Sequence, residues 1–185
     1  VPSDIDVGQY KAMGANVMVV LEAYSSEFHF PLQVPKDKDV IFVGTYNCKS
    51  KRDYVLHLAQ RGVRVWLFGG YWERSGLEGT PNITIDRPDG VWLWDYTRLI
   101  CSAKIALGLT NTDMDDTHTA RHFEIPACGT FMLAPRTKET VKFFKEGVEA
   151  EFFSSKEELL EKVRYYLEHE EERERIAAAG RRRCA

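Results

Sequence analysis

The sequence predicts an α/β fold, a doubly wound parallel sheet with helices on both faces. Apolar runs rich in Val, Ile and Phe alternate along the chain with segments of helical period. Runs that are apolar throughout, such as 39–44 and 63–68, are typical of strands buried on both faces. Strands that alternate with helices favour parallel pairing through right-handed crossovers. In such sheets ligands bind beyond the carboxyl ends of the strands, so we expect a site in the loops that follow them.

Length and composition indicate one domain, which we expect to span residues 1–185. The net charge of −3 argues against a general nucleic-acid binder. The chain lacks an apolar run of about 20 residues, so no membrane span is expected. Its four cysteines are far apart, which indicates reduced thiols in a cytoplasmic protein rather than a disulfide framework or a zinc site. Because the chain begins at Val1 without Met, we expect a fragment with both ends trimmed.

The elements expected in the first half of the chain end at recognisable residues. Gly14 stops the first helix and Gly62 stops another, because glycine accepts the backbone conformation that follows a helix. Residues 24–38 contain two prolines and are expected to form a loop draped over the sheet edge. The expected elements are helix 6–13, strand 16–21, strand 39–44, helix 52–61, strand 63–68, strand 82–85 and helix 92–102.

The second half continues the alternation. Ser155 and Glu158 form a capping box at the start of a helix whose apolar face includes Leu159 and Val163. The last helix is acidic at its start and basic at its end, which suits the helix dipole. The expected elements are strand 104–109, helix 119–127, strand 130–133, helix 138–145, strand 150–153, a helix from 156 and helix 171–183.

The stretch 116–129 carries the strongest candidate chemistry. Asp116 precedes a predicted helix and Glu124 lies within it, and a carboxylate can accept hydrogen bonds from the vicinal hydroxyls of a sugar or ribose. The N–H groups and the dipole at the helix start, 117–120, suit a diphosphate. Together they would hold a nucleotide-sugar. The alternative is that Asp116 caps the helix and Glu124 is a solvated helix residue.

A basic loop follows the strand 39–44. Gly44 ends the strand and would let a ligand approach the backbone closely. Lys49, Lys51 and Arg52 follow and could neutralise a departing diphosphate. Arg121, at the start of the predicted helix 119–127, is a further candidate for binding an anion. The alternative for the loop is a solvated surface.

The remaining polar and aromatic candidates have weaker signals. His118 could contact the sugar or a phosphate, or it could form hydrogen bonds within its loop. The pair Asp113 and Asp115 could hold a divalent metal, but the basic loop makes a metal unnecessary, and we expect none. Two groups of residues are interpreted as structural: the histidines His29, His57 and His169 as core or surface, and the aromatics Trp66, Trp92, Trp94 and Tyr96 as core.

Several short motifs together resemble one known domain. They are Phe42-Val-Gly-Thr45, Gly69-Gly-Tyr-Trp72, Ser102-Ala-Lys-Ile-Ala-Leu107, Thr117-His-Thr-Ala-Arg121, Phe123-Glu-Ile-Pro-Ala-Cys-Gly129 and the tail 172–183. With them the chain resembles the C-terminal, Rossmann-like, nucleotide-sugar-binding half of a GT-B glycosyltransferase. The likeness is strongest to the CgeB-like spore maturation family, which is related to the retaining group-1 transferases.

The resemblance implies roles for individual residues. Group-1 relatives carry two glutamates eight residues apart, and Glu124 matches the second, which implies contact with the ribose hydroxyls. Asp116 stands at the first position, one methylene shorter, and would touch the donor sugar. Thr45 replaces an Arg of the relatives, so Lys51 or Arg52 would serve the diphosphate. The helix start, with Thr117, His118, Thr119 and Arg121, would bind the diphosphate, and the loop 87–90 with Arg87 would hold the base.

These observations and the resemblance predict a domain that binds a nucleotide-diphosphate sugar of the uridine type, for transfer to an unknown acceptor. No cofactor other than the donor is expected. The partner expected is an N-terminal domain that carries the acceptor site, so the isolated chain should bind nucleotide but catalyse poorly. Two alternatives remain open: half of a nucleotide-sugar epimerase or hydrolase, and a non-catalytic doubly wound module that binds a partner.

Overall fold

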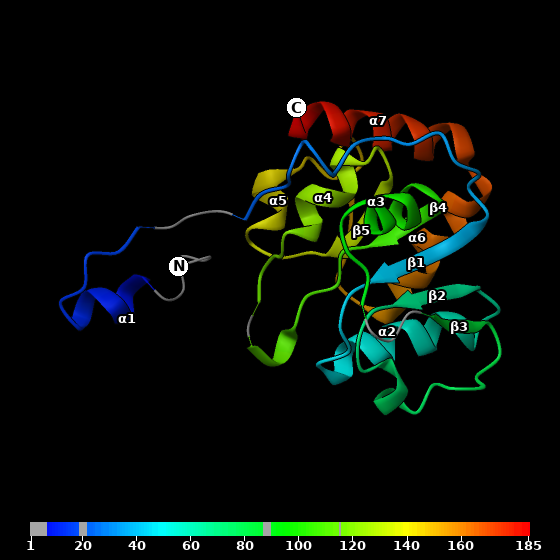
Figure 1. Ribbon diagram of the computed structural model, residues 1–185, viewed down its shortest axis with the longest axis horizontal. Helices are drawn as coiled ribbons and strands as arrows, with labels where there is room; N and C mark the ends of the chain where they lie inside the picture. The colour runs from blue at the N-terminus through cyan, green and yellow to red at the C-terminus, as the bar shows by residue number, and fades with distance from the viewer. Residues whose placement is uncertain (1–6, 19–21, 87–89, 115) are drawn as a thin grey trace.

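A computed structural model describes residues 7–18, 22–86, 90–114 and 116–185 (Figure 1). Arg87 and Asp115, which the sequence analysis singles out, lie outside the described residues. The described strands form a six-stranded sheet in the order β3-β2-β1-β4-β5-β6, and every pair in it is parallel. The strands are β1 (Lys38–Val43), β2 (Val65–Phe68), β3 (Ile83–Asp86), β4 (Ala103–Leu107), β5 (Phe131–Pro135) and β6 (Glu151–Phe153).

Helices connect the strands as predicted. They are α1 (Val7–Ala12), α2 (Lys49–Ala59), α3 (Leu93–Cys101), α4 (Arg121–Ala127), α5 (Thr140–Phe143), α6 (Lys156–Glu168) and α7 (Glu170–Cys184), with short 3₁₀ turns η1 (Trp72–Ser75) and η2 (Thr112–Met114). In the described part of the chain, none of them combines the length and apolar content that crossing a membrane requires. The predicted doubly wound parallel sheet is therefore confirmed.

Alternating side chains bury both faces of the sheet. Val40 and Phe42 of β1 face the layer formed by α2 and α6, whereas Ile41 and Val43 face the layer formed by α3 and α4. All four are buried, which explains why the strand is apolar throughout rather than alternating. Figure 1 shows the two helical layers on opposite sides of the sheet.

The strand order reverses direction between β1 and β4. From β1 the chain proceeds outward through β2 and β3, and from β4 it proceeds outward the other way through β5 and β6. The loops after β1 and β4 therefore diverge and leave a crevice at the carboxyl edge of the sheet. The basic loop at 44–52 and the acid-bearing stretch 116–129 follow these two strands, so the topology brings them together.

Two predictions for the N-terminal part are wrong. The strand expected over 16–21 is not formed at residues 16–18, and residues 19–21 lie outside the described part. The loop expected at the sheet edge instead crosses the layer of α3 and α4, and we call residues 22–37 the strap. Its contacts run from the Tyr24 hydroxyl, which donates to the Cys184 carbonyl at 2.8 Å, to Lys36, which pairs with Glu174 at 3.3 Å.

The capping box at α6 is confirmed, with one difference. The Ser155 hydroxyl accepts a hydrogen bond from the Glu158 backbone N–H at 3.1 Å. The Glu158 carboxylate reaches back to the N–H of Ser154, one residue before the cap. It also binds Arg136, and this hydrogen bond is the main cause that lowers the pKa of Glu158 to about 2. The side chain thus ties the start of α6 to the end of β5.

Gly180 in α7 provides a test of the packing of the last helix. A Cβ atom at this position would lie 2.3 Å from the backbone carbonyl oxygen of Glu149. In an exposed helix, Gly→Ala stabilises by about 1 kcal/mol. We expect Gly180→Ala to lower the free energy of unfolding instead, because α7 would have to move off the backbone at Glu149. Chemical denaturation measures the effect.

Ala178→Gly in the exposed part of the same helix is the matched control. It should cost about 1 kcal/mol from helix propensity alone. A Gly180→Ala variant as stable as the wild type or more so would contradict the close packing.

Candidate functional site

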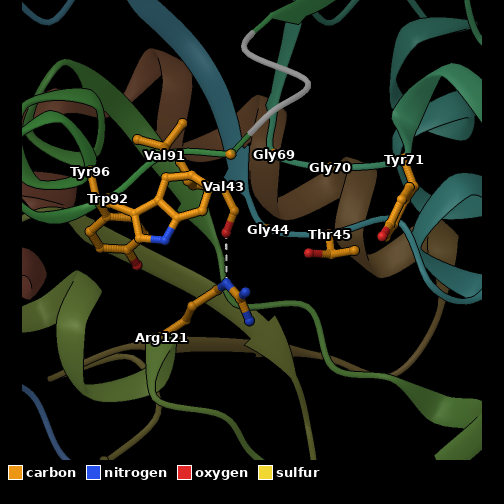
Figure 2. A pocket seen from close by; sticks show the side chains of 11 residues that line it. Val43, Gly44, Thr45, Gly69, Gly70, Tyr71, Val91, Trp92, Tyr96 and Arg121 are labelled. Atoms are coloured by element: carbon orange, nitrogen blue, oxygen red, sulfur yellow. Dashed lines mark hydrogen bonds between the residues drawn. The ribbon is translucent and has the colours of Figure 1, made fainter.

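A cavity of about 500 Å³ opens at the carboxyl ends of β1 and β2 (Figure 2). It is bounded by backbone from the loops after both strands, by the start of α3 and by one side chain from α4. The lining residues are Val43, Gly44, Thr45, Gly69, Gly70, Tyr71, Gly90, Val91, Trp92, Tyr96 and Arg121. The cavity lies where the topology predicts a ligand site, and it includes three predicted site residues, Gly44, Thr45 and Arg121.

Two glycines allow the loops after β1 and β2 to meet. Gly69 has φ of 118°, a conformation that favours glycine, and a Cβ there would lie 2.8 Å from the Gly44 carbonyl oxygen. The same oxygen accepts a hydrogen bond from Trp72 Nε1 at 2.9 Å. A Cβ on Gly44 would lie 2.7 Å from Nη2 of Arg121. The floor of the cavity is therefore formed by bare backbone with a guanidinium directly beside it.

Arg121 ties the start of α4 to β1. Its Nε donates to the Val43 carbonyl oxygen at 2.6 Å, and its guanidinium carbon lies 5.6 Å from the centre of the Phe42 ring. Figure 2 shows the side chain entering the cavity from α4, with Trp92 and Tyr71 on opposite sides. Because the guanidinium stays charged and faces the cavity, it can bind an anion there.

Lys51 places a second positive charge below the cavity. Lys51 is only 4% exposed, and its ammonium donates to Asn47 Oδ1 at 2.6 Å and to the Thr45 carbonyl oxygen at 3.3 Å. Its Nζ also lies 5.6 Å from the Phe42 ring centre. Burial, followed by repulsion from Arg121, lowers the pKa of Lys51 to about 8. An anion in the cavity would relieve this repulsion.

Two predicted site residues, Arg52 and Asp116, are not among the residues that line the cavity. Arg52 turns toward η1, where its Nε donates to the Ser75 carbonyl oxygen at 2.7 Å, and it does not line the cavity. Asp116 is exposed in the loop before α4. Its negative charge raises the pKa of Lys51, so Asp116 lies near the ammonium of that residue.

The loop residues Thr117 and His118 share one carboxylate, that of Glu139. His118 is buried, and its Nδ1 lies 2.6 Å from Glu139 Oε2, to which the Thr117 hydroxyl also donates. The Thr137 hydroxyl holds the Thr117 carbonyl oxygen at 2.8 Å. These contacts favour the hydrogen-bonding alternative for His118. Glu139 was missed by the sequence analysis, because only folding brings it beside the loop.

Glu124 lies beside the cavity wall rather than in it. Its side chain is 19% exposed, and its Oε1 lies 3.7 Å from Nε2 of His29 on the strap. Tyr96, which lines the cavity, is close enough that the charge of Glu124, after burial, raises the pKa of Tyr96 well above its ordinary value. A ligand at this end of the cavity would meet Tyr96 first and Glu124 next to it.

The aromatic residues around the cavity correct one prediction. Trp92 and Trp94 were expected in the core, but they are 65% and 52% exposed. Trp92 lines the cavity, and its ring lies where a Cβ on Gly90 would be. Tyr71, half exposed, stands on the opposite side. The composition of this segment gave no signal that distinguishes a core tryptophan from one at a cavity rim.

The described residues hold no group of three or more His, Cys, Asp or Glu side chains arranged to bind a metal ion. Asp115, one of the predicted pair of acids, is outside them. All four cysteines are free thiols. Among the described residues that line the cavity, the charged side chain is that of Arg121, and its positive charge matches an anionic ligand.

Comparison with known proteins assigns this arrangement to a family. A sequence profile described as glycosyl transferase-like matches residues 51–185. The chain belongs to this glycosyl transferase-like family. The match starts in α2 and includes the 116–129 stretch. No curated protein sequence matches the chain.

Solved structures show that this glycosyl transferase-like chain has the fold of GT-B C-terminal domains. TarM matches with a TM-score of 0.71 and 7% identity over 100% of this chain and 39% of its own. Anabaena HepE, in complex with UDP-glucose, matches with 0.70 and 14% over 98% and 57%. The C-terminal domain of a group 1 glycosyl transferase, LpcC from Francisella tularensis, matches with 0.64 and 10% over 87% and 96%. The chain therefore spans about half the length or less of the first two.

His122 links the start of α4 to the loop residue Thr119. Its Nδ1 accepts a hydrogen bond from the Thr119 backbone N–H at 3.0 Å, at the start of α4. The residue is fully buried, and burial lowers the pKa of His122 to about 4, from an ordinary value of 6.5. The neutral imidazole thus holds the backbone that leads into α4.

This burial predicts an acid-sensitive site. The unfolded chain takes up a proton on His122 below pH 6.5, whereas the folded chain does so only near pH 4. Stability contributed by the neutral imidazole is therefore complete above pH 6.5 and is lost as the pH falls toward 4. We expect His122→Asn, which keeps an acceptor but cannot titrate, to lose less Tm between pH 7 and pH 5 than the wild type.

Thermal unfolding at the two pH values measures this difference. His169→Asn, at the exposed junction of α6 and α7, is the matched control and should behave like the wild type. Equal losses of Tm in the wild type and the His122→Asn variant would show that His122 is not the titrating group.

Proposed function

We propose that this chain is the donor-binding domain of a GT-B glycosyltransferase and that its ligand is a nucleotide-diphosphate sugar. The observation that carries the proposal is a pair of cations, Arg121 and Lys51, which we call the cationic floor. Arg121 lines the glycine-rich cavity at the carboxyl edge of the sheet, and Lys51 donates to the carbonyl oxygen of the lining residue Thr45. Each cation lies 5.6 Å from the centre of the Phe42 ring. A diphosphate is the part of such a donor that needs two cations and free backbone. The fold neighbour HepE, crystallised with UDP-glucose, supports a UDP-linked donor.

The cavity gives the proposed ligand a direction. The diphosphate would lie over Gly44 and Arg121, and the base would extend toward Gly90 and Trp92. The ribose would then lie between these ends, next to Tyr96. Glu124, adjacent to Tyr96, is placed to accept hydrogen bonds from its hydroxyls. Asp116, exposed beside the opposite end, is left for the donor sugar.

The proposed chemistry requires no general acid from this domain. Binding orients the donor, and Arg121 and Lys51 stabilise the negative charge that develops on the departing diphosphate. We propose that transfer proceeds without a metal, because these two cations meet the same need. The acceptor and the rest of the active site would belong to another domain, in a cytoplasmic enzyme of CgeB-like type. The isolated chain should therefore turn over slowly or not at all.

The test is calorimetry with UDP, ADP, GDP and CDP. The wild-type chain should prefer UDP, and Glu124→Ala should weaken UDP binding roughly tenfold or more, since a hydrogen bond to a charged group contributes about 1.5–3 kcal/mol. Glu161→Ala, an exposed acid on α6, is the matched control and should bind like the wild type. Unchanged affinity in Glu124→Ala would remove the ribose role.

Two outcomes would favour the alternatives. If the wild-type chain binds none of the four nucleotides, a module that binds a protein partner becomes the better explanation. If it converts a UDP-sugar without an acceptor, product analysis will reveal an epimerase or a hydrolase.

The lowered pKa of Lys51 predicts that the chain takes up protons when it binds a nucleotide diphosphate. With a pKa of about 8, the amine is about half protonated at pH 8. A diphosphate nearby favours the charged form and raises this pKa, so binding should take up roughly half a proton per site at pH 8. Calorimetry in buffers of different ionisation enthalpy measures the uptake.

Lys51→Met should abolish the uptake and weaken binding. Lys49→Met is the matched control, because the Lys49 side chain is 81% exposed and should leave the uptake intact. Proton release by the wild-type chain at pH 8 would contradict the proposed contact.

A further inference from the structure

We infer that His29 is a positioning residue that orients the Glu124 carboxylate toward the ribose of the bound nucleotide. The inference rests on the proposed function and extends it to the strap, which the sequence analysis treated as a connecting loop. Three side chains from three separate segments meet at this end of the cavity, and we call them the carboxylate cluster: His29 from the strap, Tyr96 from α3 and Glu124 from α4.

The backbone of the strap fixes which nitrogen of His29 carries the proton. Nδ1 accepts a hydrogen bond from the Ser25 backbone N–H at 3.0 Å, so the hydrogen of the neutral ring is on Nε2. Nε2 faces Glu124 Oε1 at 3.7 Å, and the two side chains are 12% and 19% exposed. This distance is longer than a hydrogen bond, and contacts of this kind tighten when a ligand binds.

The strap is anchored on both sides of His29. The Thr97 hydroxyl donates to the Phe28 carbonyl oxygen, and the Leu32 N–H donates to Cys101 Sγ at 3.4 Å. The rings of Phe28 and Phe30 both pack edge-on against Trp94, with centres 5.7 and 5.4 Å away. Since its neighbours are fixed to α3, His29 is held at the carboxylate rather than free to sample the surface.

Tyr96 connects the cluster to the cavity. Its ring lines the cavity wall, and the His29 ring packs edge-on against it with centres 5.6 Å apart. The Tyr96 hydroxyl is buried and makes no hydrogen bond of regular geometry among the described residues, although it lies close enough to the Glu124 carboxylate for this neighbour to raise the pKa of Tyr96. Leaving such a group unpaired costs about 1–3 kcal/mol. A ribose hydroxyl between Tyr96 and Glu124 would satisfy it, so the cluster is arranged for a ligand that brings hydroxyl groups.

The discriminating measurement compares UDP with 2′-deoxy-UDP. The wild-type chain should bind UDP more tightly, roughly tenfold, because the deoxy ligand lacks a hydroxyl for the carboxylate. His29→Ala should weaken UDP several-fold and leave 2′-deoxy-UDP nearly unchanged, so most of the preference is lost. His29→Gln, which keeps an N–H donor near the position of Nε2, should restore most of it.

Lys36→Ala is the matched control on the strap, because it removes the Glu174 contact far from the cluster and should keep the full preference. Equal weakening of both ligands by His29→Ala, or an unchanged preference, would overturn the positioning role. If His29→Ala does not fold, His29→Gln decides the question: full loss of the preference with retained UDP binding contradicts the inference. Failure of the wild-type chain to bind UDP would overturn the proposed function itself.

Discussion

The site depends on the close approach of backbone at Gly44. Three segments meet at this residue: the Gly44 N–H donates to the Phe68 carbonyl oxygen at 2.8 Å, the indole of Trp72 binds its carbonyl, and Arg121 lies where a Cβ would be. The ends of β1 and β2 and the start of α4 are therefore fixed relative to one another around the bare backbone of Gly44. A cavity with exposed backbone and one guanidinium is the consequence of this packing.

That packing places like charges close together. Lys51 and Arg121 both lie 5.6 Å from the centre of the Phe42 ring, and the buried ammonium of Lys51 is held by an amide oxygen and a carbonyl rather than by a carboxylate. The protein thus keeps two desolvated cations near each other at a cost in stability. Structural ion pairs elsewhere in the chain follow the opposite pattern: Arg136 lies between Glu146 and Glu158. The contrast supports the proposal that an anionic ligand binds here.

Much of the fold could be predicted from local pattern, and the reasons are visible in single elements. Strand β1 is buried on both faces, so its continuous apolar run predicted a strand correctly. The Ser155 cap likewise predicted where α6 begins. The strand expected at 16–21 is not formed at residues 16–18, because an apolar run alone does not determine whether a neighbouring strand is available to pair with it. The exposure of Trp92 likewise depends on the neighbouring loops, not on its own residue type.

Site residues at the ends of recognisable helices and strands could be predicted from the sequence, whereas residues that only folding brings to the site could not. Gly44 and Arg121 could be found because each stands at the end of a recognisable element. The sequence could not distinguish the roles of the neighbouring residues Lys51 and Arg52. In the helix their side chains point in different directions: Arg52 donates to the Ser75 carbonyl oxygen, whereas Lys51 donates to that of Thr45, which lines the cavity. Glu139 and His29 come from distant segments, and each acts on a side chain that the sequence did single out, His118 and Glu124.

The two acids of the 116–129 stretch now have different physical settings. Asp116 is exposed and near the cationic floor, where solvent weakens any single contact. Glu124 is largely shielded, next to a buried hydroxyl and an oriented imidazole, where a hydrogen bond is stronger and its geometry is restricted. A carboxylate held in this way can discriminate among hydroxyl patterns, whereas a solvated one mainly adds charge. The difference in environment, rather than the shared acidity, makes Glu124 the residue on which recognition of a ribose would depend.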